Sequence, residues 1–88
     1  MGNMNGLPPL DQIDSEAFGA ALHAARKRAG LTMDAAAERV GARSASQLLR
    51  WETGERVPSF FYVTRIAYAF PSLSVERQAA LLFGRLEE

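Results

Sequence analysis

The sequence contains no cysteine, and its 88 residues include a single histidine. These absences exclude disulfide bonds and cysteine-based metal sites, and they disfavour any other transition-metal site. No apolar run approaches the ~20 residues that a bilayer-spanning helix needs. Residues 1–14 lack the basic flank and apolar centre of a signal peptide. We therefore expect one cytoplasmic domain with no membrane association, no cofactor and no small-molecule ligand.

Catalytic signatures are also lacking. The chain has no Gly-rich phosphate loop and no paired-carboxylate signature. Its one histidine, His23, lies one turn before Lys27 on the outward side of a predicted helix, where we expect it to be solvated. No Ser-His-Asp set is credible around such a residue, so we expect no enzymatic activity.

The net charge is zero, because ten basic side chains balance ten acidic ones. Affinity for nucleic acids depends largely on neutralised phosphates, so this balance counts against nucleic-acid binding. The charges are unevenly distributed, however. The central stretch contains Arg39, Arg43, Arg50 and Arg56. Half of the acids lie in the terminal segments: Asp11, Asp14, Glu76, Glu87 and Glu88. A small basic patch on a neutral domain is compatible with this distribution.

Apolar residues recur at helical spacing along most of the chain, which predicts an all-α domain. Caps and glycine or proline stops divide the pattern into five helices, at about 15–29, 32–40, 44–53, 59–70 and 74–86. Residues 1–14 are rich in Gly, Asn and Pro and show no period, so we expect a disordered tail. The expected core stripe of the fourth helix is Phe60, Val63, Ile66, Ala67 and Phe70. That of the fifth helix is Val75, Ala79, Leu82, Phe83 and Leu86.

The second and third predicted helices form the most informative stretch, from Leu31 to Pro58. Thr32 is the expected cap of the first of the two, and Gly41 ends it. Ser44 begins the next helix and has, with Gln47, the spacing of a capping box. On that helix Leu48, Trp51 and Glu52 face one way, while Ser46, Arg50 and Thr53 face the other. A short helix with such a polar free face suits the major groove of DNA.

The same stretch resembles the phage-repressor and Cro-type helix-turn-helix family. The residues that carry the resemblance are Gly30-Leu31-Thr32, Ala36-Ala37, Val40-Gly41, Arg50-Trp51-Glu52-Thr53-Gly54 and Arg56-Val57-Pro58-Ser59. The resemblance runs from about Phe18 to Phe70 and implies a compact five-helix, lambda-repressor-like DNA-binding domain. The chain departs from the family in two respects. The turn before Ser44 is one residue longer than usual, and Met33 replaces a polar residue that often touches the DNA backbone.

The resemblance implies a DNA interface on the helix at 44–53. The candidate base contacts are Arg50, Ser46, Gln47 and Ser44. Arg50 can bond guanine in a bidentate manner, and its alternative role is a phosphate clamp. The two serines can serve a phosphate or a base edge, and Gln47 can bond adenine or hold a phosphate. The candidate phosphate contacts are Arg43, Arg56 and Thr32. Leu49, on the flank, is a candidate for a thymine methyl contact.

Arg26 and Glu52 are expected to form a structural ion pair, because the family pairs an arginine and a glutamate at the matching positions. We expect this pair to fix the first helix against the third rather than to touch DNA.

The predicted fourth helix has an excess of aromatic residues. Phe61, Tyr62 and Tyr68 stand at positions that are more often polar in the family. These side chains either fill the space left by the small Ala36 or cover an interface. Tyr68 and Leu81 are the candidate surface for a dimer or another partner.

The resemblance thus favours a sequence-specific transcription regulator that binds double-stranded DNA. The implied form is a homodimer on an inverted-repeat operator, typically a repressor or autoregulator of a phage or mobile element. The alternative is a protein-interaction module that kept the fold and lost DNA binding. The neutral charge, Met33 and the aromatic fourth helix favour this alternative.

Overall fold

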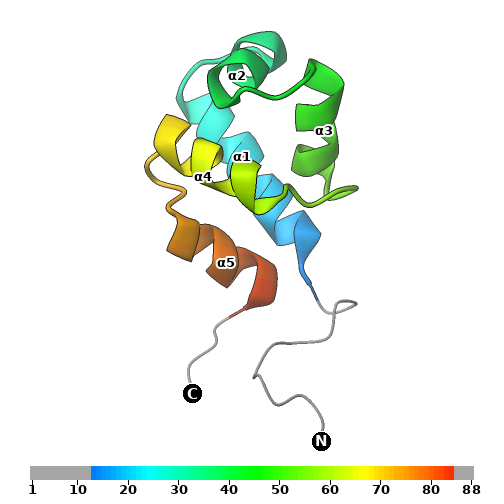
Figure 1. Cartoon of the computed structure of the whole chain (residues 1–88), viewed down its shortest axis with the longest axis vertical. Coiled ribbons are helices and arrows are strands. Elements are labelled where there is room, and N and C mark those ends of the chain that lie inside the picture. Colours follow the sequence, from blue (N-terminus) through cyan, green and yellow to red (C-terminus); the bar gives the residue numbers. More distant parts are fainter. Residues whose placement is uncertain (1–12, 85–88) are drawn as a thin grey trace, which may run out of the picture.

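The computed structural model describes residues 13–84, which fold into helices joined by short turns. In chain order these are α1 (Ser15–Arg28), α2 (Met33–Val40), α3 (Ala45–Thr53), α4 (Phe60–Ala69) and α5 (Val75–Phe83). α2 and α3 lie at one end of the molecule and α5 at the other, with α1 behind and α4 in front (Figure 1). α5 packs against α1 and α4, as expected. The prediction of an all-α domain is confirmed.

Each helix begins where the sequence supplies a capping residue. The side chains of four N-cap residues accept a hydrogen bond from a backbone N–H in the first turn: Asp14, Thr32, Ser44 and Ser74. Ser59 is the N-cap of α4 but makes no such bond. The predicted ranges counted most of these caps as helical, so α2 to α5 start one residue later than expected.

The ends of the chain differ from the prediction in two places. The backbone N–H of Asp14 donates to the carbonyl of Leu82 over 2.7 Å, and Ile13 packs against the core. These two residues are therefore part of the folded domain, and the predicted tail retains only residues 1–12, which lie outside the described residues. α5 ends at Phe83 because Gly84 leaves the helical conformation with φ of 75°. Leu86 lies outside the described residues.

One apolar core joins all five helices. Its buried members are Phe18, Leu22, Ala25, Ala36, Ala37, Val40, Leu48, Trp51, Ile66, Phe70, Leu73 and Leu82. Two predicted core residues were wrong: the Phe60 side chain is 71% exposed and that of Val75 is 37% exposed. Both are the first residue of their helix. Phe60 also lies about 120° around the helix from Ile66, which faces the core.

Gln78 is a buried polar residue that the apolar pattern did not identify. Its side chain is fully buried, and its Nε2 donates to the carbonyls of Val63 (3.0 Å) and Leu73 (2.8 Å). Its Oε1 has no hydrogen-bond partner among the described residues. The amide therefore ties α5 to α4 and to the loop between them, at the cost of one unsatisfied acceptor.

α1 and α3 approach each other closely at Gly19. A Cβ atom at this position would lie 2.5 Å from the carbonyl oxygen of Trp51 and would also overlap that of Glu52. Near the same crossing, the Ser15 hydroxyl donates to the carbonyl of Gly54 over 2.8 Å. The position of α3 is thus set by direct contact between α1 and the C-terminal turn of α3.

A buried ion pair completes the junction of α1 and α3. Arg26 Nε donates to Glu52 Oε2 over 2.7 Å, and Nη2 donates to Oε1 over 3.2 Å. Arg26 Nη1 also donates to the carbonyl of Leu31. The hydrogen bond to Glu52 raises the pKa of Arg26 above its ordinary value, although burial opposes this shift. The guanidinium is therefore charged at every pH at which the protein folds.

His23 was expected to be solvated, and this expectation was only partly right. Its side chain is 52% exposed, but its Nδ1 lies 2.9 Å from Glu52 Oε1 and 3.2 Å from Arg26 Nη2. A carboxylate only accepts hydrogen bonds, so Nδ1 donates to Glu52 when it carries a proton. In the other neutral tautomer, Nδ1 accepts from Arg26. His23 thus shields one edge of the ion pair from solvent.

We expect Gly19→Ala to destabilise the protein. Alanine normally favours a helix over glycine by about 1 kcal/mol. Here the added methyl collides with backbone that cannot move aside, at a net cost of about 1–3 kcal/mol. Chemical denaturation measures the difference. Ala20→Gly, at the exposed neighbouring position, isolates the propensity effect. An equal or higher stability of Gly19→Ala would contradict the close approach.

Arg26→Ala should lower stability by about 3–5 kcal/mol, because it leaves the buried Glu52 carboxylate without its main partner. The double variant Arg26→Met, Glu52→Met removes both charges and should lose less. Thermal denaturation compares the melting temperatures of the unaltered protein, Arg26→Ala and the double variant. DNA binding is then compared at a temperature where all are folded. An unchanged melting temperature with lost binding would show that Arg26 acts on DNA instead.

Candidate nucleic-acid interface

α3 has two chemically distinct faces. Leu48, Trp51 and Glu52 are buried, and they fix the helix on the core and on Arg26. The opposite face carries four exposed residues: Ser46, Leu49, Arg50 and Thr53. The Thr53 hydroxyl donates to the carbonyl of Arg50, within the helix. The outward face therefore offers one long cation, a hydroxyl and the apolar Leu49, whose side chain is 47% exposed.

The turn between α2 and α3 accommodates its extra residue by packing it inward. Gly41 adopts the left-handed conformation with φ of 74°, and the N–H of Ala42 donates to the carbonyl of Ala37. Ala42 then packs against the core. Arg43 and Ser44 remain exposed on the outer side. Ala42 therefore anchors the longer turn to the core.

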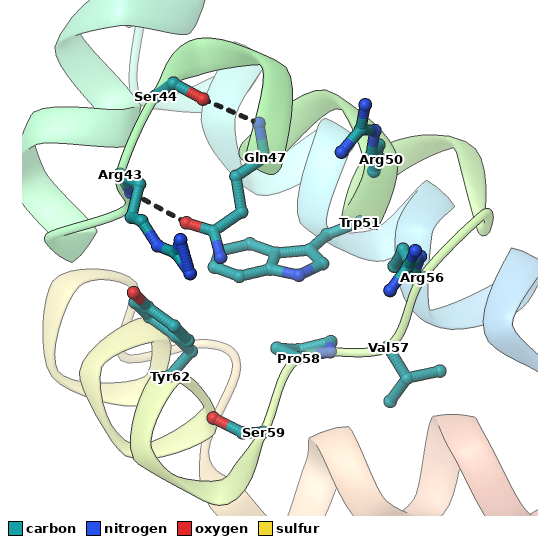
Figure 2. Close-up of a pocket in the computed structure, with 10 residues that line it drawn as sticks. All are labelled: Arg43, Ser44, Gln47, Arg50, Trp51, Arg56, Val57, Pro58, Ser59 and Tyr62. Atoms are coloured by element: carbon teal, nitrogen blue, oxygen red, sulfur yellow. Dashed lines mark hydrogen bonds between the residues drawn. The ribbon is translucent and has the colours of Figure 1, made fainter.

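Gln47 makes a different hydrogen bond from the one expected of a capping box. The Ser44 hydroxyl accepts from the backbone N–H of Gln47, as predicted. The Gln47 Oε1, however, accepts from the N–H of Arg43 over 2.7 Å and not from that of Ser44 (Figure 2). This bond directs the Gln47 amide oxygen toward the turn, whereas a bidentate contact with adenine needs both the oxygen and the NH₂ group of the amide directed at the base.

The segment after α3 folds back along that helix. The N–H of Arg56 donates to the carbonyl of Arg50 over 3.1 Å. This bond places the Arg56 side chain beside that of Arg50 (Figure 2). Pro58 follows, buried, and leads into α4.

These segments enclose a groove of about 360 Å³ between α3 and the start of α4. One wall consists of Arg43, Ser44, Gln47 and Arg50. The other consists of Arg56, Val57, Pro58 and Ser59. The floor is formed by Trp51 and Tyr62, whose ring centroids are 4.9 Å apart. Three arginines from three segments thus border one groove (Figure 2).

The arginines of this groove are available to bind an anion. Among residues 13–84, the ion pairs involve Glu52 with Arg26 and with His23, and not Arg43, Arg50 or Arg56. Glu52 lies on the reverse face of α3, so its charge is balanced within the core. The groove is therefore a local positive region on a protein with zero net charge.

The predicted site residues are not all in one place. Arg43, Ser44, Gln47, Arg50 and Arg56 line the groove, whereas Ser46 lies on the outward face of α3. Thr32 is exposed at the start of α2, and its hydroxyl accepts from the N–H of Ala35. Met33 is half-buried against the core, so its side chain serves packing.

Sequence reasoning missed the α4 side of the groove. Ser59 and Tyr62 border it, together with Val57. Pro58-Ser59 was recognised as a helix start, and Tyr62 follows one turn later on the side that faces Trp51. The one-turn spacing of Ser59 and Tyr62 was the sequence signal that could have identified this side of the groove. Tyr62 packs on Trp51 and against the core, whereas Phe61 is 59% exposed.

The two candidate partner-surface residues differ in environment. The Tyr68 side chain is 91% exposed. Leu81 is half-buried and packs against the core, so it offers little surface to a partner. The role of Leu81 in a dimer or partner surface, like that of Tyr68, stays a prediction.

None of the helices formed by the described residues is both long enough and apolar enough to span a membrane.

A comparison of the chain with protein families agrees with this geometry. Neither the curated proteins nor the solved structures include a match to the chain. A family model described as a helix-turn-helix domain matches residues 17–80, which include the groove and nearly all of the five helices. Such domains are typical of DNA-binding regulators. The chain belongs to the helix-turn-helix domain family, as the resemblance of its central stretch predicted.

Proposed function

We propose that the protein is a sequence-specific transcription regulator that binds double-stranded DNA with α3 in the major groove. The observation that carries this proposal is the groove bordered by Arg43, Arg50 and Arg56 beside the exposed face of α3. An α-helix fits the major groove, and cations at its flanks meet the phosphates that border the groove.

Arg50 is the proposed base-reading residue. It lies in the last turn of α3, is exposed and is free of acidic partners among the described residues. Its guanidinium can donate to O6 and N7 of guanine together, a contact worth ~1–3 kcal/mol of discrimination. Ser46 and Ser44 supply hydroxyls near the start of the helix. Leu49 is placed to contact a thymine methyl.

Arg43 and Arg56 are the proposed phosphate anchors. They flank α3 on the turn before it and on the segment after it, and both border the groove. Two anchors at opposite ends fix the angle at which a helix enters the DNA without reading sequence. The N-terminus of α2 at Thr32 is a further proposed phosphate contact, because the start of a helix attracts anions.

A homodimer on an inverted repeat is the proposed binding form. A single α3 offers few base contacts, and the neutral chain gains little from long-range attraction. Two copies related by a two-fold axis would double both the base contacts and the attraction to phosphates. Their half-sites would lie about one turn, or ~34 Å, apart. A dimer bound in this way occludes the DNA between its half-sites, which favours repression.

The proposed biological role is that of a repressor or autoregulator of a phage or mobile element, acting in the cytoplasm on nucleoid DNA. This assignment is supported by the resemblance to phage repressors in the central stretch. This biological role requires no DNA contact beyond those described above.

Arginine substitutions test the DNA-binding proposal. Sequences selected from a random duplex pool provide the ligand, and binding is measured over a range of salt concentrations. Arg50→Ala should flatten the preference at one base position by ~1–3 kcal/mol. Arg56→Ala should weaken binding to all sequences alike and reduce the salt slope by about one unit. Arg77→Ala, on α5 and away from the groove, is the matched control.

Binding that does not depend on salt, or no selection of any sequence, would refute the DNA proposal. That outcome would instead favour a protein-interaction module. The observation that supports this second function is the set of exposed aromatic side chains on α4, at Phe60, Phe61 and Tyr68.

Gln47 is proposed as a positioning residue rather than a base reader, because its Oε1 holds the N–H of Arg43. Gln47→Ala should therefore lower affinity for all sequences without changing base preference. The Arg43 amide should also exchange its hydrogen faster with solvent, as measured by NMR. Ser46→Ala, one residue earlier, is the control for the amide exchange. A selective loss of preference at an adenine position in Gln47→Ala would contradict the assignment.

A further inference from the structure

The outward face of α4 carries three exposed aromatic residues, with Thr64 and Arg65 between them. The side chains of Phe60, Phe61 and Tyr68 are 71%, 59% and 91% exposed. Phe60, Thr64 and Tyr68 are spaced four residues apart and therefore lie along one side of the helix, with Phe61 at its edge. Large apolar side chains that gather on one exposed surface mark interaction sites more often than isolated ones do.

Two polar side chains of this face, Thr64 and Arg65, are already hydrogen-bonded within the protein. The Thr64 hydroxyl donates to the carbonyl of Phe61 over 2.7 Å, so its methyl group remains as the outward surface. Arg65 Nε donates to the carbonyl of Val40 over 2.7 Å, and its guanidinium lies 5.6 Å from the Phe61 ring centroid. α4 contains no acidic residue. The Thr64 hydroxyl can therefore be buried without being left unpaired.

The pattern along this face is self-complementary. A small residue, Thr64, stands midway between two aromatic residues, four positions from each. In an antiparallel pair of identical helices that cross at Thr64, Phe60 of each copy meets Tyr68 of the other. The two contacts lie about 12 Å apart, on either side of the two-fold axis.

We propose that the outward face of α4, formed by Phe60, Phe61, Thr64 and Tyr68, binds the same face of a second copy of this chain. This inference rests on the homodimer of the proposed function and names its surface. Burial of the three exposed rings removes roughly 300–550 Å² from each copy. A standard stable interface removes about 800 Å² from each partner. The free dimer is therefore weak, and binding to both half-sites strengthens it.

Single-cysteine crosslinking tests the inference, since the native sequence contains no cysteine. Thr64→Cys places one thiol at the two-fold axis, where it meets its symmetry mate. Under mild oxidation at submillimolar concentration and without DNA, this variant should form a disulfide-linked dimer at least about tenfold faster than Val75→Cys. Val75 is partly exposed on another helix and serves as the matched control. Circular dichroism establishes that both variants are folded.

Tyr68→Ala in the Thr64→Cys background separates a specific pair from random collision. Because Tyr68 is almost fully exposed, its removal should leave the fold intact and reduce crosslinking to the rate of Val75→Cys. Equal rates for Thr64→Cys and Val75→Cys, or crosslinking unaffected by Tyr68→Ala, would overturn the proposed face. Binding of the same proteins to DNA with a single half-site measures DNA binding separately from dimer formation. Half-site binding without crosslinking refutes only this interface, and crosslinking without any DNA binding refutes only the proposed function.

Discussion

The contact between α1 and the C-terminal half of α3 is the constraint on which the rest of this domain depends. Gly19 lets the two helices touch through backbone atoms, and the bidentate pair of Arg26 with Glu52 fixes their angle. Trp51, beside Glu52, then forms the floor of the groove under Tyr62. The orientation of α3 is thus set from behind, by groups that take no part in the exposed surface. In the proposed DNA complex, a helix held in this way loses little conformational entropy when it binds.

The sequence predicted the features that depend only on neighbouring residues along the chain. Thr32, Ser44 and the glycines at 41 and 54 fixed the boundaries of α2 and α3, because caps and left-handed exits are local features. The two faces of α3 followed from helical period. The pair of Arg26 and Glu52 came from family resemblance, since nothing in the spacing of residues on two different helices predicts contact between them.

Other features depend on tertiary contacts that no local pattern encodes. The capping-box spacing predicts a bond from the Ser44 N–H to Gln47, but in the folded turn Gln47 Oε1 accepts from the N–H of Arg43. Gln78 is polar by composition but buried, because α4 and the following loop present two carbonyls to it. Phe60 was placed in the core by its apolar nature, although its position around the helix directs it to solvent. The groove itself joins α3 to residues of α4 that come more than ten positions later, so only the folded chain could reveal it.

The separation of the two faces of α3 has a consequence for how such a protein can change its target. Ser46, Leu49, Arg50 and Thr53 share a helix with Leu48, Trp51 and Glu52, yet none of the first group contributes to the buried core. Mutations in the exposed set are therefore released from the demands of folding. If the proposed function holds, a new DNA target can be acquired by exchanging a few outward side chains on an unaltered scaffold, so binding preference can diverge while the architecture is retained.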